Sequence, residues 1–294
     1  MPELPEIEHL RRTLEQVLPG TMVRGVTLLR PDIVRCSDSR SRRPRPRVSR
    51  RDLLIGRQIH RLVRHGKELA IVSRAGPVIC VHLGMSGQLW HCPPGKRLRR
   101  ADHVHCLWQL TAPRTGRGHG RLVFRDPRRF GGLWCFTSLQ ELFAMRWKQL
   151  GPDALQISAA RLRQSLARTS RSIKAALLDQ RILAGIGNIY ADEILFAAGI
   201  HPQSAASRLP ADRYRRLALT IRHLLATAIA HGGSTVRDYV DGRGSAGSYA
   251  QRHRVYGRAA MPCMTCGKQL CALTVAQRTT VFCSVCQVLF PRES

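Results

Sequence analysis

Acidic residues are few in this chain. Its 294 residues include 19 Asp and Glu against 48 Lys and Arg, so the formal net charge is +29. No apolar run approaches the ~20 residues of a membrane-spanning helix and no signal-peptide pattern opens the chain, so we expect a cytoplasmic protein with no membrane partner. The excess of positive charge predicts a polyanionic partner, and nucleic acid is the first candidate.

Lysine is scarce as well, with five lysines against 43 arginines. An arginine stays protonated in proteins, whereas a lysine amine can lose its proton. Lys67 and Lys174 therefore indicate places that require an amine. The ten cysteines are accompanied by no secretion signal, which argues against a disulfide framework.

Only four cysteines fall into a paired spacing, and they predict a metal site. The pattern is Cys-x2-Cys, sixteen residues, then Cys-x2-Cys, which is typical of tetrahedral zinc. Its members are Cys263, Cys266, Cys283 and Cys286. Four thiolates fill the coordination shell, so we expect one structural zinc ion rather than a catalytic one. Strand-like runs between the two pairs predict a β-hairpin that carries Arg278.

The hydrophobic pattern predicts three successive parts. A helix with apolar residues three and four positions apart comes first, and short strand-like runs separated by Gly and Pro continue to about residue 136. From about residue 138 the pattern is helical, which places a domain boundary near residues 140–150. These signals indicate an α+β chain in which a sandwich or barrel precedes a helical part and the cysteine hairpin.

Two stretches lack periodicity. Residues 37–51 contain seven arginines and almost nothing apolar, which predicts a basic loop, either a solvated charge run or a DNA contact. Residues 232–253 are rich in Gly and Ser and are typical of a functional loop. Between them, residues 181–195 predict a helix, a Gly-bracketed turn and a second helix whose first backbone amides could bind a phosphate.

The sequence begins Met-Pro-Glu, and Pro2 is a candidate for covalent chemistry. With Met1 removed, Pro2 carries a secondary amine with a reference pKa of about 7.7–8.0, so much of it is neutral at the pH of the cell. Such an amine attacks an aldehyde carbon to give an iminium, with Glu3 beside it. The alternative is that Pro2 only begins a strand or caps a helix.

Motifs along nearly the whole chain resemble the bacterial formamidopyrimidine-DNA glycosylases, base-excision enzymes that remove 8-oxoguanine and ring-opened purines and also cleave abasic sites. These motifs are MPELPEIE at the N-terminus, RHGKEL around Lys67, HLGMSGQL (82–89), DPRRFGGL (126–133), GIGNIYADEILF (185–196), GGSTVRDYV (232–240) and the four-cysteine finger with QRTTVFC (277–283). The resemblance implies a β-sandwich over residues 1–140, a helix-two-turns-helix domain over 141–253 and a zinc finger over 254–290. It also implies a monomer that binds damaged double-stranded DNA between these parts.

The resemblance implies roles for single residues. Pro2 is similar in position to the Schiff-base nucleophile, Glu3 to the general acid that assists opening of the sugar ring, and Lys67 to the proton donor of β-elimination. Arg278 resembles the finger arginine that grips the phosphates at the lesion and is linked to δ-elimination. The implied DNA contacts are His82, Met85, His103, Arg128, Arg129, Phe130, Lys174 and Asn188.

Within this set, three residues are expected to enter the duplex. Met85, Arg128 and Phe130 would fill the space left by an extruded nucleotide, because inserted side chains partly offset the cost of pulling a base from the stack. Arg129 and Asn188 would hold backbone phosphates, and Lys174 would lie near the lesion.

The chain departs from the family pattern at Ala101, where a DNA-contacting histidine is common, at His65, where a second arginine is frequent, and at residues 37–51, which look like an insertion. Two alternatives remain open. One is an endonuclease VIII-like enzyme for oxidised pyrimidines, although that branch typically begins Pro-Glu-Gly-Pro. The other is a catalytically silent zinc-finger DNA-binding protein, although binding alone would not require Pro2, Glu3 and Lys67.

Overall fold

The computed structural model describes residues 2–36, 53–98, 101–112, 115–234 and 241–291, so the predicted basic loop at 37–51 lies outside the described residues. The chain divides into two compact units. The N-terminal unit comprises Met1–Lys148 and Gly232–Ser248, and the C-terminal unit comprises Gln149–His231 and Tyr249–Ser294. A segment from late in the sequence is therefore part of the first unit.

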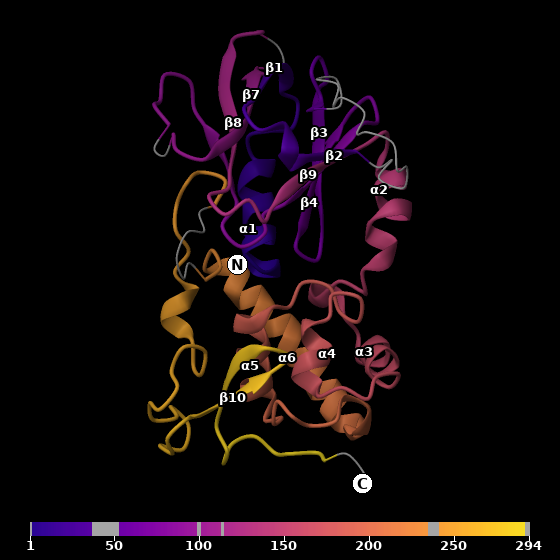
Figure 1. Cartoon of the computed structure of the whole chain (residues 1–294), viewed down its shortest axis with the longest axis vertical. Coiled ribbons are helices and arrows are strands. Elements are labelled where there is room, and N and C mark those ends of the chain that lie inside the picture. Colours follow the sequence, from indigo (N-terminus) through magenta and orange to yellow (C-terminus); the bar gives the residue numbers. More distant parts are fainter. Residues whose placement is uncertain (1, 37–52, 99–100, 113–114, 235–240, 292–294) are drawn as a thin grey trace. The chain divides into compact units, whose positions relative to one another are not determined.

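Two β-sheets form the framework of the N-terminal unit (Figure 1). The four-stranded sheet has, in order, β1 (Met22–Leu28), β7 (Val104–Thr111), β8 (Gly118–Arg125) and β6 (Gln88–Cys92). The five-stranded sheet has, in order, β2 (Val34–Cys36), β9 (Gly132–Phe136), β5 (Val78–His82), β4 (Glu68–Ser73) and β3 (Ile59–His65). All neighbouring strands are antiparallel except β2 and β9.

Helix α1 (Leu4–Glu15) packs into the core of this unit. Its residues Ile7, Leu10 and Leu14 lie three and four positions apart, which places them on one helix face. They are buried in one cluster with strand residues that include Trp108, whose Nε1 donates a hydrogen bond to the backbone oxygen of Leu53 at 3.1 Å. Apolar packing thus fixes one face of α1, and the polar residues of the helix are available for hydrogen bonds and ion pairs.

The C-terminal unit is helical with a short hairpin (Figure 1). Its helices are α3 (Ala159–Leu166), α4 (Ile173–Leu178), α5 (Asn188–Ala198) and α6 (Ala211–Ala230). Helix α5 packs against α4, α6 and the second hairpin strand, so nearly all of its residues are buried. The hairpin consists of β10 (Cys271–Val275) and β11 (Arg278–Phe282). In the N-terminal unit, α2 (Leu139–Met145) follows the last strand.

The predicted β-sandwich, helical part and cysteine hairpin are confirmed, but three details differ from the prediction. Strands β2 and β6 were not predicted, because one is three residues long and the other directly follows the HLGMSG turn. The first helix expected within 181–195 is not found among these described residues: helix α4 ends at Leu178, and the chain then turns, since the Asp179 carboxylate accepts a hydrogen bond from the backbone of Arg181. No helix in the described part of the chain is both long enough and apolar enough to span a membrane.

Candidate functional site

The N-terminal residues Pro2 and Glu3 are buried at the start of α1. Glu3 is the N-cap of the helix, and its backbone nitrogen donates a hydrogen bond to Glu6 Oε2 at 2.7 Å. Glu6 occupies the N3 position of a capping box, in which a side chain binds one of the otherwise unpaired amides of the first turn. The backbone that carries Pro2 and Glu3 is thus fixed by a buried carboxylate.

The segment 232–234 reaches the other oxygen of the same carboxylate. Ser234 donates a backbone hydrogen bond to Glu6 Oε1 at 2.6 Å. Gly233 has φ 76°, and a Cβ at this position would lie 2.5 Å from Glu6 Oε1, so only glycine fits. Glu6 therefore joins the N-terminus to the beginning of the GGSTVRDYV motif.

Lys67 lies in the two-residue turn between β3 and β4 and is buried. Gly66, in the same turn, has φ 54°. At the start of β4, Glu68 accepts hydrogen bonds from Arg146 at 2.5 and 2.8 Å and from Trp147 Nε1 at 2.9 Å. A buried acidic residue thus fixes the β4 side of the turn that carries Lys67.

The turns of HLGMSGQL and DPRRFGGL are joined by Asp126. This buried carboxylate accepts the hydroxyl of Ser86 at 2.6 Å and the backbone N–H of Gly131 at 2.7 Å. The Ser86 oxygen in turn accepts the backbone N–H of Arg128 at 3.1 Å. A Cβ at Gly84 would lie 2.5 Å from the Phe130 backbone, so the two turns pack in direct contact.

These joined turns present an apolar and cationic group at the surface. Met85 is 41% exposed and Phe130 is 54% exposed. The Arg128 guanidinium lies 4.8 Å from the centre of the Phe130 ring, a cation–π contact. His82, at the end of β5, is partly buried, and this burial lowers its pKa. Large apolar side chains on rigid turns are suited to insertion into another molecule.

A basic pocket of about 440 Å³ lies beside the second turn. Arg30, His103 and Arg129 line it, together with apolar residues and His105. His103 and Arg129 both have φ 56°, an uncommon conformation for residues other than glycine. Two arginines and two histidines at one pocket favour an anion such as a phosphate.

In the C-terminal unit, the Lys174 side chain is completely buried. Its Nζ lies 2.6 Å from Asp192 Oδ1 and donates hydrogen bonds to Thr280 Oγ1 at 2.7 Å and to the Thr279 backbone oxygen at 3.2 Å. Asp192 Oδ2 accepts the backbone N–H of Val281 at 3.0 Å. Burial raises the pKa of Asp192 to about 6, although Lys174 opposes this shift. The ion pair joins α4 and α5 to strand β11.

Asn188 contacts Thr279, the hairpin residue that directly follows Arg278. Asn188 is the first residue of α5, and its Nδ2 donates to the Thr279 backbone oxygen at 3.1 Å. Arg278 is exposed at the start of β11, directly after a tight turn in which Ala276 and Gln277 have φ 48° and 58°. The helix start and the finger arginine are thereby held in one local structure.

The four paired cysteines form a cluster. All four sulfur atoms lie within 4.8 Å of one another, and the shortest separations join Cys266 to Cys283 (3.5 Å) and Cys263 to Cys286 (3.9 Å). Four sulfurs each about 2.3 Å from a central ion have separations of this size, so the cluster fits a tetrahedral zinc. Cys271 is exposed on β10 and is not part of the cluster.

Comparison with known proteins decides the family. The family model described as Formamidopyrimidine-DNA glycosylase N-terminal domain matches residues 1–133, and the Formamidopyrimidine-DNA glycosylase H2TH domain matches residues 150–240. Relatives named Formamidopyrimidine-DNA glycosylase are 39% identical over 292 residues in Shewanella halifaxensis and 37% identical over 291 residues in Desulforamulus reducens. Both alignments cover 98% of this chain and at least 99% of the relative. The chain belongs to the formamidopyrimidine-DNA glycosylase family.

Solved structures of the family from Lactococcus lactis have the same fold. A mutant in complex with a Fapy-dG containing DNA has a TM-score of 0.83, and the complex with an abasic site containing DNA has a TM-score of 0.82. A wild-type complex with an oxidized pyrimidine containing DNA also has a TM-score of 0.82. Each is 30% identical and covers 97% of this chain and 99% of the other.

The site residues expected of a formamidopyrimidine-DNA glycosylase are divided between the two units. The N-terminal unit holds Pro2, Glu3, Lys67, His82, Met85, His103, Arg128, Arg129 and Phe130, and the C-terminal unit holds Lys174, Asn188, Arg278 and the four cysteines. Met85, Arg128 and Phe130 come from adjoining turns. The structure places Lys174 inside its unit, so a contact between its amine and DNA stays a prediction that requires the Asp192 pair to open.

Sequence reasoning missed the acidic residues that hold this family's motifs in place. Glu6, Asp126 and Asp192 were not singled out, although each lies inside a quoted motif. The small number of acidic residues in the chain was the signal that could have identified them. In a chain with 19 acidic residues, those within motifs are candidates for buried anchors rather than for surface charge.

Proposed function

We propose that this chain removes oxidised purines from duplex DNA and then cleaves the resulting abasic site. Its membership of the DNA glycosylase family over nearly the whole chain supports this activity. The observation that carries extrusion of a nucleotide from the duplex is the exposed group of Met85, Arg128 and Phe130 on two interlocked turns. Binding to an intact duplex does not need such a group, whereas extrusion of a nucleotide leaves a gap that it can fill.

The chemical step is assigned to Pro2. Its secondary amine bonds to C1′ of the damaged nucleotide, and the bond between C1′ and the base breaks. Glu3 assists opening of the sugar ring, which breaks the bond between C1′ and O4′ and leaves an iminium. β-Elimination then removes a proton from C2′ and breaks the bond between C3′ and its phosphate oxygen, with Lys67 as the proposed proton donor. Two observations support this assignment. Pro2 and Glu3 lie at a helix start that is held by a hydrogen bond to Glu6, and Lys67 lies in a turn of the same unit whose next residue, Glu68, is held by Trp147.

DNA phosphates are assigned to two groups of residues. In the N-terminal unit, His82, His103 and Arg129 are the proposed contacts, and the pocket formed with Arg30 supplies the matching positive charge. In the C-terminal unit, Asn188 and Arg278 are proposed, supported by their common attachment to Thr279 and by the exposed Arg278 side chain. Arg278 also assists δ-elimination at the lesion.

The cysteine cluster is proposed to hold one zinc ion. Its thiolates would fill the coordination shell and leave no position for a reacting water, so the metal would stabilise the hairpin that carries Arg278. We further propose a cytoplasmic monomer with the three domains expected from the sequence.

Borohydride trapping tests the proposal. The full chain with Met1 removed is incubated with an 8-oxoguanine duplex and borohydride, and a covalent adduct at Pro2 is expected. Retention of Met1 should abolish the adduct and leave duplex binding nearly unchanged, because it converts the Pro2 nitrogen into an amide that cannot attack C1′. If both forms trap DNA equally, Pro2 is not the nucleophile. If neither traps but both bind, the chain is a silent DNA-binding protein.

A second substrate class follows from one of the solved relatives. The Lactococcus lactis protein has been solved with an oxidized pyrimidine containing DNA. The same trapping assay with a matched oxidised-pyrimidine duplex therefore decides between the two classes. We expect faster single-turnover excision of the purine lesion, and a preference for the pyrimidine lesion would favour the endonuclease VIII-like alternative.

A further inference from the structure

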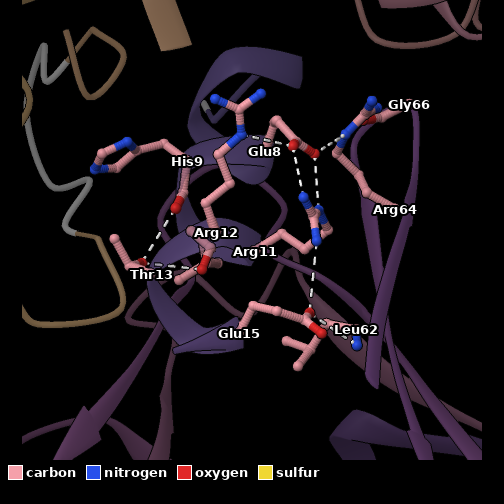
Figure 2. A network of polar contacts seen from close by, with 10 residues as sticks. Glu8, His9, Arg11, Arg12, Thr13, Glu15, Leu62, Arg64 and Gly66 are labelled. Carbon is pink, nitrogen blue, oxygen red and sulfur yellow. Dashed lines mark hydrogen bonds and ion pairs between the residues drawn. The ribbon is translucent and has the colours of Figure 1, made fainter. Parts of the chain in front are cut away.

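A network of ion pairs joins α1 to the strand that leads into the Lys67 turn (Figure 2). At its centre is Glu8, whose side chain is 7% exposed. The Glu8 carboxylate pairs with Arg11 and Arg12 of its own helix at 2.9 Å and with Arg64 of β3 at 3.0 Å. Arg11 and Arg12 belong to the same helix as Glu8, whereas Arg64 belongs to β3 and also contacts the turn that contains Lys67.

Arg64 uses two different donors for two different partners. Its Nε binds Glu8 Oε2, and its NH1 group donates a hydrogen bond to the Gly66 backbone oxygen at 3.0 Å. The Gly66 carbonyl belongs to the peptide bond that leads into Lys67. Because guanidinium is planar and its donors have a fixed geometry, this arrangement fixes that peptide relative to α1.

The Glu8 carboxylate at the centre of this network is ionised at neutral pH. Burial opposes ionisation of Glu8, but hydrogen bonds from Arg11 and Arg12 and the charge of Arg64 outweigh it and lower the pKa of Glu8 to about 2. The carboxylate is therefore charged at neutral pH. Buried ion pairs are seldom kept for stability, since apolar replacements are often as stable. A positional role explains its presence better.

We infer that Glu8 and Arg64 are positioning residues that hold the Lys67 amine in register with the helix that carries Pro2 and Glu3. This inference rests on the proposed function. Arg64 fixes the β3 side of the turn, as Glu68 with Arg146 and Trp147 fixes the β4 side. Lys67 thus lies between two buried anchors, and proton transfer requires such precision of placement.

The test compares Arg64→Met and Arg64→Lys in the full chain. Both remove the hydrogen bond to the Gly66 oxygen, but the lysine can keep the ion pair with Glu8. At saturating enzyme, we expect both variants to slow strand cleavage at a preformed abasic site by about tenfold to a hundredfold. The borohydride adduct, which depends on Pro2, should form at close to the wild-type rate.

Glu15→Ala is the matched control. Glu15 also ties α1 to β3, through the backbone N–H of Leu62 at 3.0 Å, but it does not touch the turn. The control should lose stability and keep its cleavage rate. The inference is overturned if Glu15→Ala slows cleavage as much as Arg64→Met, if Arg64→Lys cleaves at the wild-type rate, or if adduct formation and cleavage fall together.

Hydrogen exchange of the backbone amides at 64–69 gives a readout that needs no activity. Exchange should be faster in both Arg64 variants than in wild type and unchanged in Glu15→Ala. If wild-type protein forms no adduct, the proposed function fails, while exchange still decides whether Arg64 holds the turn. Equal hydrogen exchange in the wild type and all variants would show that Arg64 does not hold the turn.

Discussion

At the scale of single residues, Phe130 offers the sharpest test of base extrusion. Phe130→Ala should lower excision from an 8-oxoguanine duplex at least about tenfold, because an intact stack must be opened there. Cleavage at a preformed abasic site should change much less. Stability should change by no more than about 0.5 kcal/mol, since the side chain is 54% exposed. Single-turnover kinetics on the two substrates measures the difference.

Phe143 provides the control for that experiment. It is an equally exposed phenylalanine of the same unit, at 56%, but it belongs to α2 and not to either turn. Phe143→Ala should leave both reactions unchanged. Equal slowing of both reactions by Phe130→Ala would contradict the insertion role. The exposure of Phe130 already excludes an ordinary place in the sandwich core.

Lys174 allows a prediction about pH. Lys174→Met leaves the Asp192 carboxylate buried without its cation, which costs about 3–5 kcal/mol when the carboxylate is charged. The pKa of Asp192 is already raised to about 6, and loss of Lys174 raises it further. An acid whose pKa is raised in the folded state stabilises that state at low pH. This contribution to the free energy of unfolding is lost as the pH rises through the raised pKa. The loss of thermal stability should therefore be larger at pH 8 than at pH 5.

The double variant Lys174→Met with Asp192→Asn separates the pair from a DNA contact. With both charges removed, most of the stability should return. Asp192→Asn alone should weaken DNA binding as Lys174→Met does, if the pair acts through the hairpin it holds. Stronger DNA binding by Asp192→Asn would instead mean that the released amine reaches DNA.

At the scale of elements, the hairpin carries the proposed metal site, and Cys283 is its buried member on the second cysteine pair. Cys283→Ala should lose the metal and weaken DNA binding together, because the metal contributes folding free energy to a finger with a small core. Metal content by mass spectrometry and binding by fluorescence anisotropy check this. Cys271→Ala, on the same hairpin but outside the cluster, should keep one zinc per chain. Retention of stoichiometric zinc by Cys283→Ala would contradict the ligand assignment.

Most elements could be predicted from the sequence, because their signals are local. The residues that carry each signal are close together in the sequence. This holds for the apolar residues of α1, for the alternating residues of each strand and for each cysteine pair. Contacts made by segment 232–248 could not be predicted in this way. Gly242, for example, donates its backbone N–H to Thr13 of α1 at 3.0 Å, a pairing of residues 229 positions apart. No periodic pattern encodes a contact over that separation.

The same limit applies to the site. The residues that touch DNA in the proposed function were found from motifs, whereas the residues that hold them were not. Asp126 hydrogen bonds with residues 40 positions earlier and five positions later, and Arg64 reaches Glu8 across 56 positions. Eight of the 19 acidic residues are buried in the described part of the chain. Scarce carboxylates therefore serve as internal anchors in a strongly basic protein.

At the scale of the whole molecule, the net charge of +29 is expected to attract DNA in general. This attraction is distinct from recognition and excision of the damaged base. Binding of phosphates by lysine and arginine releases counterions, so affinity falls with salt by a slope of about 0.9 per neutralised phosphate. This effect does not depend on the sequence or damage of the DNA. Variants that change only the general charge should therefore shift affinity for every duplex by the same factor.

The basic stretch 37–51 tests this separation. Replacing it with a Gly/Ser linker of equal length removes seven arginines and keeps the chain length between the flanking residues. If these arginines bind phosphates, affinity for damaged and undamaged duplexes should fall equally, and the salt dependence should become shallower by about 0.9 for each phosphate that is no longer neutralised. The single-turnover excision rate at saturating enzyme should stay at the wild-type value. A lower excision rate with unchanged affinity would place the stretch in lesion handling, whereas no change in either quantity would make it a solvated charge run.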